Sequence, residues 1–328
     1  MKKIRLGLIG AGWVASQHMK TISAVLDEVE AVGVCSRTFA KAAAFAKEQC
    51  IPMVAKDMAA LVKDTEPDAL MILVSEDQMK TVALEAMGFG LPLFIEKPAG
   101  LTPEDNLTLA QSAEKYKIRT MVGFNRRYYS IFHKGIEIIR RHGQLRGVVV
   151  EGHERMWRVR AGGKFPEAVL EQWIYANSTH TIDLLRFFGG EATQVQTITH
   201  RHTENKGDQF AAIMELECGA IGQYMAHWYS PGGWRVVLYG DGVTVEFKPL
   251  ERGRWIDKNS VVHDIQPDEI DAKYKAGFYR QIEAFRRLVR EGSYEWPVAD
   301  LADSLKTMEL AQKFTKHVTL VRENSPRN

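Results

Sequence analysis

The fold of this 328-residue chain is decided by residues 4–15, which read IRLGLIGAGWVA. An apolar run, Ile4–Ile9, leads directly into the pattern G-x-G-x-x-A and the start of a helix. Gly10 permits a tight turn, Gly12 leaves room for a pyrophosphate, and the small side chain of Ala15 lets helix and strand pack closely. Free N–H groups at the start of the helix can hold phosphate charge. The stretch therefore predicts a dinucleotide-binding Rossmann unit.

Short apolar runs and helical stretches alternate outward from this loop as far as residue 123. The helices should include one that begins at the cap Thr102-Pro103. Such alternation is typical of a parallel sheet covered by helices on both faces. The expected strands are Ile4–Ile9, Val29–Cys35, Ala69–Val74, Leu93–Ile95 and Thr120–Val122, and the expected helices are Val14–Val25, Ala40–Gln49, Asp77–Met87 and Glu104–Lys117.

The second half of the chain has a different pattern. A helix is expected at Arg127–Arg141 and a long strand at Leu145–Val159, and from about residue 191 apolar residues alternate with a period of two. Asp241-Gly242 predicts a type I′ hairpin turn. We therefore expect an α/β protein with a Rossmann domain at residues 1–123, and a second α/β domain with a large open antiparallel sheet at 124–328. The cleft between them is the expected ligand site.

The last part of the chain predicts two closing helices. The first carries an apolar stripe. Its members are Phe278, Ile282, Phe285 and Val289.

Composition limits the classes of partner and location. The chain has 43 Lys and Arg against 41 Asp and Glu, a net charge of +2, which gives no electrostatic reason to expect a nucleic acid or an acidic membrane. Three widely spaced cysteines do not form a disulfide framework and fit a reducing compartment. Neither a targeting signal nor an apolar run of about 18 residues is found. We expect a cytoplasmic protein.

The end of the second expected strand bears on the choice of coenzyme. An NAD site normally places an acidic residue there, but this chain reads Cys35-Ser36-Arg37-Thr38. The hydroxyls of Ser36 and Thr38 and the guanidinium of Arg37 could bind a 2′-phosphate, which favours NADP over NAD. The alternative is that Arg37 only stacks over the adenine of either coenzyme.

The sequence Glu96-Lys97-Pro98 closes the fifth expected strand, 86 residues after Gly10. Parallel α/β folds bind ligands at the carboxyl ends of their strands. Pro98 holds Lys97 in an extended conformation. There, the ammonium group could hydrogen-bond a substrate oxygen and stabilise alkoxide charge. The alternative is a solvated surface lysine.

His180 and Asp183, three residues apart, share one face of an expected helix. His180 could carry the hydroxyl proton of a substrate, although such a pair is also common on ordinary helix surfaces.

His200 and His202 share a strand face, but no third ligand is evident, so no metal is expected. At most one tryptophan is expected to touch substrate. The tryptophans of the second half considered for this role are Trp157, Trp173, Trp228 and Trp234.

These ordered motifs, with the segment VGFNRR at 122–127, resemble the glucose-fructose oxidoreductase / inositol dehydrogenase family (Gfo/Idh/MocA). The resemblance extends along essentially the whole chain. It implies NAD(P)-dependent oxidation or reduction of a sugar-like alcohol or carbonyl, where the substrate is a sugar, cyclitol or nucleotide sugar. It also implies that the second sheet forms a substrate wall and the interface of a homo-oligomer, either a dimer or a tetramer.

The resemblance also implies roles for individual residues. Lys97 would contact the substrate and the nicotinamide ribose, Glu96 would help to set the cofactor site, and the peptide bond before Pro98 is often cis. His180 would be the proton carrier, and Asn125 would lie near the nicotinamide. The expected cofactor-binding residues are Gly10, Ala11, Gly12, Trp13, Val14, Ser36, Arg37, Thr38, Val74, Ser75, Glu96, Lys97 and Asn125, and the expected substrate residues are Lys97, Asn177, His180, Trp157 and Asp183.

Two departures from the family pattern concern the catalytic assignment. Many relatives carry an Asp four residues before the histidine, where this chain has Ala176. His180 would then be less basic, or Asn177 would orient the substrate instead. The segment VSEDQ at 74–78 also lacks the family's T-P-N-x-x-H pattern. Two alternatives stay open: a dinucleotide-binding regulatory protein without turnover, and a reductase of a non-sugar carbonyl or imine.

Overall fold

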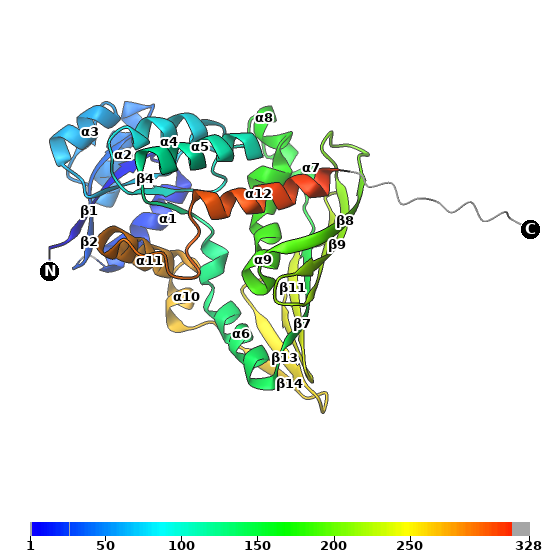
Figure 1. The fold of residues 1–328 in the computed structure, drawn as a ribbon. Helices are drawn as coiled ribbons and strands as arrows, with labels where there is room; N and C mark the ends of the chain where they lie inside the picture. Colours follow the sequence, from blue (N-terminus) through cyan, green and yellow to red (C-terminus); the bar gives the residue numbers. More distant parts are fainter. Residues whose placement is uncertain (1, 26, 317–328) are drawn as a thin grey trace, which may run out of the picture.

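The computed structural model describes residues 2–25 and 27–316. They form two sheets, one with six strands and one with eight, joined by helices that run between them (Figure 1). Within these residues, no helix is both long and apolar enough to cross a membrane.

The N-terminal sheet is entirely parallel, with strand order β3-β2-β1-β4-β5-β6. The order reverses between β1 and β4, so the loops after these strands flank a crevice where α/β folds bind ligands. The Rossmann prediction is confirmed. The strands are β1 (Ile4–Ile9), β2 (Val29–Cys35), β3 (Val54–Ala55), β4 (Ala69–Ile72), β5 (Leu93–Ile95) and β6 (Thr120–Val122).

The helices of this part agree with the expected stretches, and short 3₁₀ turns at Ser23–Val25 and Glu76–Gln78 extend two of them. Sequence analysis missed β3, because a two-residue edge strand has no measurable period, and it also missed the short helix α3. The Thr102 hydroxyl accepts a hydrogen bond from the Asp105 amide at 3.2 Å, as the predicted cap requires. The helices are α1 (Trp13–Ile22), α2 (Phe39–Gln49), α3 (Met58–Thr65), α4 (Met79–Met87) and α5 (Pro103–Tyr116).

The C-terminal sheet has the order β14-β13-β12-β11-β7-β10-β9-β8. Its pairs are antiparallel except for β7 with β10, which run parallel, so the sheet is mixed and the expected purely antiparallel sheet is corrected. The chain leaves β7 through helices, and the β9–β10 hairpin then inserts beside it. The strands are β7 (Leu145–Gly152), β8 (Ala192–His200), β9 (Gln209–Leu216), β10 (Ile221–His227), β11 (Trp234–Gly240), β12 (Val243–Phe247), β13 (Gly253–Asp257) and β14 (Val262–Ile265).

Three local predictions in this part need correction. The expected long strand ends at Gly152, and helix α7 (Met156–Ala161) follows it. The hairpin between β11 and β12 is present, but at its tip only Gly242 has a positive φ, 68°, so the turn is not type I′. Helix α6 (Ser130–His142) begins only after a 3₁₀ turn at Asn125–Tyr128.

Several helices cover one face of the eight-stranded sheet. They include α6, α9 (Thr179–Gly189) and the closing helix α12 (Leu301–Thr315), which also packs against α5. In Figure 1, α12 runs from the Rossmann part toward the large sheet. The short helices α8 (Glu167–Leu170) and α10 (Glu269–Lys273) complete the second part.

Helix α11 (Phe278–Glu291) carries the predicted apolar stripe back to the N-terminal sheet. The Phe285 and Phe94 rings lie 5.5 Å apart, and α11 packs against α1. Helix α11 therefore packs the C-terminal part of the sequence against the Rossmann sheet.

The division into domains at residues 123 and 124 stays a prediction.

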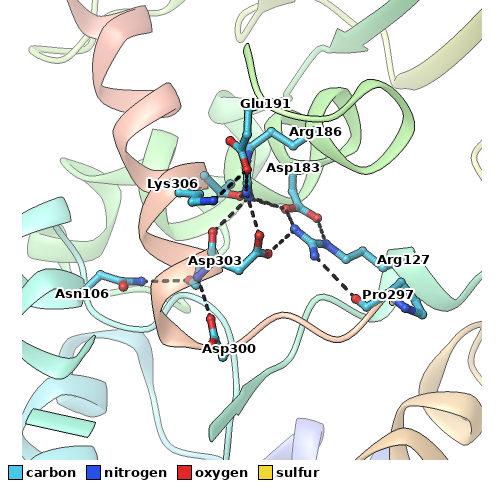
Figure 2. A network of polar contacts seen from close by, with 11 residues as sticks. Asn106, Arg127, Asp183, Arg186, Glu191, Pro297, Asp300, Asp303 and Lys306 are labelled. Carbon is cyan, nitrogen blue, oxygen red and sulfur yellow. Dashed lines mark hydrogen bonds and ion pairs between the residues drawn. The ribbon is translucent and has the colours of Figure 1, made fainter. Parts of the chain in front are cut away.

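A buried ion network joins the segment that crosses between the two parts to α9 and α12 (Figure 2). The Arg127 Nε and Nη2 donate to the two Asp183 carboxylate oxygens at 2.8 and 2.6 Å. Arg127 Nη2 also lies 2.7 Å from Asp303 Oδ2, and Arg186 Nη2 lies 2.7 Å from Asp303 Oδ1. Burial tends to raise the pKa of Asp303, but the two guanidinium groups outweigh it, and the pKa is lowered. The network therefore favours the ionised form of Asp303.

We expect Arg127→Met to lower the free energy of unfolding by about 3–5 kcal/mol, because the buried Asp183 loses its bidentate partner and keeps only a longer ion pair with Arg186, at 3.7 Å. Denaturant unfolding at neutral pH measures this change. The matched control is Arg141→Met, which removes an exposed pair with Glu137 at 3.4 Å and should change stability by less than about 0.5 kcal/mol. Equal effects of the two substitutions would contradict a stabilising role for the network.

Candidate active site

The loop after β1 forms an open cradle at the start of α1. Gly10 has a φ of 112°, and a Cβ there would lie 2.3 Å from the Leu73 carbonyl oxygen, so the turn requires glycine. A Cβ at Gly12 would meet nothing within 4 Å. No side chain caps the first turn of α1, and the Trp13 side chain is 66% exposed. The unsatisfied N–H groups of this turn therefore face free space, which fits a diphosphate.

The loops after β2 and β4 meet beside this cradle. Ser36 is half-buried, whereas Arg37 and Thr38 are exposed. The pKa of Asp77, in the loop after β4, is lowered mainly by a hydrogen bond from Ser75 and also by the positive charge of Arg37. The expected adenosine-side residues are thus brought together across the crevice.

Glu96 connects the reacting end to the phosphate helix. Its Oε1 lies 2.7 Å from Nε2 of the buried His18 on α1, and its Oε2 accepts from the Lys97 amide at 3.2 Å. Both carboxylate oxygens therefore have protein partners. Glu96 fixes the backbone of Lys97 relative to the cradle.

Lys97 spans the cleft. Its Nζ donates to the Ala176 carbonyl oxygen at 2.9 Å, and the Lys97–Pro98 peptide bond is cis, as the resemblance implied. Burial lowers the pKa of Lys97 to about 8, with Arg126 acting in the same direction and Glu76 opposing it. Lys97 is therefore not a solvated surface lysine. It carries an ammonium group into the space between the two parts.

The partner of Lys97 lies in a π-helical turn, Ile174–Ser178, directly before α9. Ala176 is buried in the apolar core of the second part, and its carbonyl accepts from Lys97. The next residue, Asn177, donates from Nδ2 to Glu154 Oε1 at 2.7 Å. π turns insert one extra residue into a helix and occur often at functional sites. The Ala176 side chain lies in the core, whereas the Asn177 side chain reaches Glu154.

His180 follows this turn and is buried in the same cleft. Burial lowers the pKa of His180 well below its usual value, and the charges of Arg126 and Lys97 lower it further. Its Nδ1 has no hydrogen-bond partner within the part of the chain that is described. Burial and the neighbouring charges therefore favour the neutral imidazole. The expectation that the missing aspartate makes His180 less basic stays a prediction, because the causes of this shift are burial and nearby cations.

Sequence analysis missed Glu154, which lies two residues after the end of β7 and is 8% exposed. Burial raises the pKa of Glu154 to about 7, although hydrogen bonds from Asn177 and Trp234 and the charge of Lys97 oppose the shift. The expected strand had included this position, so no motif distinguished it. Only the end of the strand and the folding of distant segments show that it is buried at a site.

Trp234 is the tryptophan that lies at this site. The Arg126 guanidinium carbon lies 4.5 Å from the Trp234 ring centroid, and the His180 ring lies 6.0 Å from it. A cavity of about 410 Å³ borders this group. Its lining residues include Glu154, Arg155, Arg158, Trp234, Leu250 and Glu251.

The segment before α11 closes the cofactor side of the cleft. Asn125 is buried and donates from Nδ2 to the Ala276 carbonyl oxygen at 3.1 Å. Lys275 Nζ lies 4.3 Å from the Trp13 ring centroid. Burial lowers the pKa of Lys275, and Arg126 lowers it further. Sequence analysis did not identify Lys275, because no local pattern places it opposite the glycine loop.

Two expected substrate residues do not join the group. Both Asp183 oxygens are bound by Arg127, and Thr307 also donates to Oδ1 at 2.8 Å, so this carboxylate belongs to the buried network. Trp157 lies on α7 and is 40% exposed, and it is absent from the lining of the cavity beside Glu154. The residues described contain no group of three potential metal ligands.

Two family models match the chain. Residues 4–124 match the NAD-binding Rossmann domain of the Gfo/Idh/MocA oxidoreductase family, and residues 143–246 match a C-terminal domain of the same family. Inositol 2-dehydrogenase of Corynebacterium glutamicum is 23% identical over 89% of this chain and 87% of its own length. The enzyme of that name from Salmonella typhimurium is 25% identical, over 57% of this chain, and the chain spans 55% of that relative.

Solved structures share the fold. An oxidoreductase from Thermotoga maritima has a TM-score of 0.80 at 18% identity and covers 96% of both chains. Levoglucosan dehydrogenase in complex with NADH has a TM-score of 0.81 at 15% identity over 95% of this chain and 96% of its own. UDP-N-acetylglucosamine 3-dehydrogenase from Acidithiobacillus ferrooxidans has a TM-score of 0.75 at 21% identity over 96% and 97%.

The two loop glycines should respond differently to alanine. Gly12→Ala meets no protein atom, so we expect unchanged denaturant stability but at least about tenfold weaker binding of NAD⁺ or NADP⁺, because the methyl group enters the diphosphate space. Gly10→Ala should lower the free energy of unfolding by about 2 kcal/mol or more. Calorimetry and denaturant unfolding measure these two effects. Undiminished coenzyme binding by the Gly12 variant would show that the diphosphate does not lie there.

Proposed function

Because the chain belongs to the Gfo/Idh/MocA oxidoreductase family, we propose that it is an NAD(P)-dependent oxidoreductase of sugar-like secondary alcohols or the corresponding carbonyls. The substrate is a sugar, a cyclitol or a nucleotide sugar. The observation that carries the proposal is the hydrogen bond from Lys97 Nζ to the Ala176 carbonyl oxygen at 2.9 Å. It brings a cation at the carboxyl edge of the Rossmann sheet into a cleft that also contains His180 and Glu154.

The cofactor site consists of the cradle and the loops around it. The bound nicotinamide coenzyme supplies the hydride acceptor or donor for this chemistry. The uncapped turn of α1 holds the diphosphate, and Asn125 lies at the nicotinamide end. The residues that we assign to coenzyme binding are Gly10, Ala11, Gly12, Trp13, Val14, Ser36, Arg37, Thr38, Val74, Ser75, Glu96, Lys97 and Asn125.

On the substrate side, Lys97 binds the oxygen of the reacting carbon and stabilises its negative charge. Neutral His180 hydrogen-bonds the same hydroxyl group. Asn177 orients the substrate from the π turn. Trp234 takes the place that we had expected for Trp157, because its ring lies at the cleft and can cover the apolar side of a sugar ring.

We also propose NADP over NAD, cytoplasmic location and a homo-oligomer. The NADP proposal rests on the end of β2, which lacks an acidic residue and exposes Arg37.

The cytoplasmic location rests on the three cysteines, which are free thiols and suit a reducing compartment. The uncovered face of the large sheet exposes apolar side chains that a second copy of the chain would bury. These side chains are Ile198, Ile213, Ile221 and Met225.

The coenzyme preference should depend on Arg37. We expect Arg37→Ala to weaken NADP⁺ binding at least about tenfold, because a charge-assisted contact to the 2′-phosphate is lost, and to leave NAD⁺ binding almost unchanged. Calorimetric titration with each coenzyme measures this difference. Lys47→Ala, at the far end of α2, makes the same charge change and should affect neither. Equal weakening of both coenzymes by Arg37→Ala would support adenine stacking instead.

The role of Lys97 should appear in the pH profile. Lys97→Met is expected to lower kcat/KM by about 100-fold or more, because the oxyanion loses its counter-charge. The charged form predominates below the pKa of about 8, so wild-type kcat/KM should fall above that pH. Lys97→Arg keeps its charge to higher pH and should not show this fall at pH 8.

A panel of sugars, cyclitols and nucleotide sugars, followed by nicotinamide absorbance, measures these rates. His180→Ala serves as the second variant. Unchanged turnover in both Lys97→Met and His180→Ala would refute the assigned roles. Coenzyme binding by the wild type without any absorbance change across the panel would favour a non-catalytic regulatory protein.

A further inference from the structure

We propose that Glu154 is the catalytic group that accepts the hydroxyl proton of the substrate during oxidation and returns it during reduction. The inference rests on the proposed function and names a residue for its proton step. Nothing in the sequence motifs assigns a role to Glu154, which lies in the short segment between β7 and α7.

The contacts of Glu154 place it on the substrate side of the cleft. Asn177 Nδ2 donates to its Oε1 at 2.7 Å, and Asn177 directly follows the residue that accepts from Lys97. Glu154 and Trp234 line the same cavity, and Trp234 in turn contacts His180 and Arg126. Lys97 is also close enough for its charge to lower the pKa of Glu154, so a substrate oxygen that is bound by Lys97 would lie near the Glu154 carboxylate.

The other acidic groups near the cleft have partners of their own or lie on the coenzyme side. Glu251, which lines the same cavity, is exposed and accepts from the Tyr129 hydroxyl at 3.1 Å. Glu96 uses both oxygens, for His18 and for the Lys97 amide. Asp183 is paired with Arg127 inside the network. Glu76 lies in the loop after β4, on the coenzyme side. Glu154 is the buried carboxylate, among the residues described, that enters from the substrate domain toward Lys97.

The neighbouring charges suit a group that exchanges protons. Lys97 faces Glu154 from the end of β5, and Arg126 faces it from the 3₁₀ turn after β6. Both favour its ionised form, whereas burial favours the neutral form and raises the pKa of Glu154 to about 7. Tyr224 on β10 is a further titratable neighbour, and burial raises the pKa of that phenol beyond the working range. The cavity beside Glu154 is also lined by His153, Arg155, Arg158 and Glu251. A base with a pKa close to the working pH can both accept and release a proton.

His180 is less suited to this step. Its surroundings include three cations, those of Arg126, Lys97 and Lys275, and they oppose the formation of a fourth positive charge. Cations lower the pKa of both groups, but burial raises the pKa of the Glu154 carboxylate and lowers that of the His180 imidazole, so burial and the cations add at His180 and oppose each other at Glu154. Proton transfer to Glu154 also leaves Lys97 charged throughout the reaction.

The step balances as follows. The O–H bond of the alcohol breaks, its proton forms a bond to a Glu154 carboxylate oxygen, and the oxygen electron pair forms the new C=O bond. The C–H bond breaks, and its electron pair leaves as hydride to the nicotinamide ring. The carbinol is oxidised to a carbonyl, the coenzyme is reduced, and Glu154 later releases the proton to water.

The kinetic test compares variants in the oxidation direction with any alcohol of the panel that the wild type uses. Wild-type kcat/KM should rise with pH through about 7, because the ionised form of Glu154 is the base. We expect Glu154→Gln to lose about 100-fold or more and to lack this rise, with unchanged coenzyme affinity. Glu154→Asp should restore part of the rate together with the rise. Glu137→Gln, an exposed change on α6, should behave as the wild type.

A spectroscopic titration measures the proton on this carboxylate without turnover. The protonated carboxyl band in the infrared spectrum should titrate near pH 7 in the folded wild type and be missing from Glu154→Gln. Absence of such a band, or a Glu154→Gln variant that keeps both its rate and its pH dependence, would overturn the assignment to Glu154. If the wild type shows the band and binds coenzyme but oxidises no alcohol and reduces no carbonyl, the proposed oxidoreductase function fails instead.

Discussion

The bidentate ion pair between Arg127 and Asp183 is the interaction on which the geometry of the cleft depends. It fastens the chain, where it leaves the Rossmann sheet, to the first turns of α9. The two residues before Arg127 point elsewhere: Arg126 stacks on Trp234, and Asn125 holds the Ala276 carbonyl. The turn at Asn125–Tyr128 thus places the Arg126 guanidinium in the cleft and the Arg127 guanidinium in the buried network. Loss of the buried pair would remove a contact that positions both the turn with Arg126 and the start of α9.

The same pair explains why a histidine and an aspartate stand three residues apart on α9. Residues at this spacing lie on one helix face, yet they reach different surroundings here. His180 lies in the cleft beside Trp234, whereas Asp183 lies one turn deeper, with Arg127 and Thr307. The aspartate therefore orients the helix that presents the histidine. The sequence motif suggests that His180 and Asp183 act as a catalytic pair. In the structure only His180 lies in the cleft, and Asp183 holds α9 through Arg127.

The sequence predicted the parts of the protein that depend on local contacts. The glycine loop, the strand-end Lys97 and the cap at Thr102 are set by neighbours along the chain, so their patterns were readable. Glu154, Trp234 and Lys275 were missed as a group, because they meet only after β7, β11 and the segment before α11 assemble around α9. The parallel pairing of β7 with β10 was missed for the same reason, since a strand pattern does not record the direction of its neighbour. The site residues that could not be predicted are those from distant segments.

The π turn at Ile174–Ser178 affects which side chains before His180 point into the cleft. Counting back four residues from His180 reaches Ala176, and the missing carboxylate there suggests a chain without turnover. In the structure, residue 176 is buried in the apolar core, so a carboxylate at this position would require burial of a charge among apolar groups. Asn177 reaches the cleft in its place and donates to a glutamate from β7's end. The Ala176 side chain thus lies in the core, while its carbonyl oxygen accepts from Lys97 in the cleft.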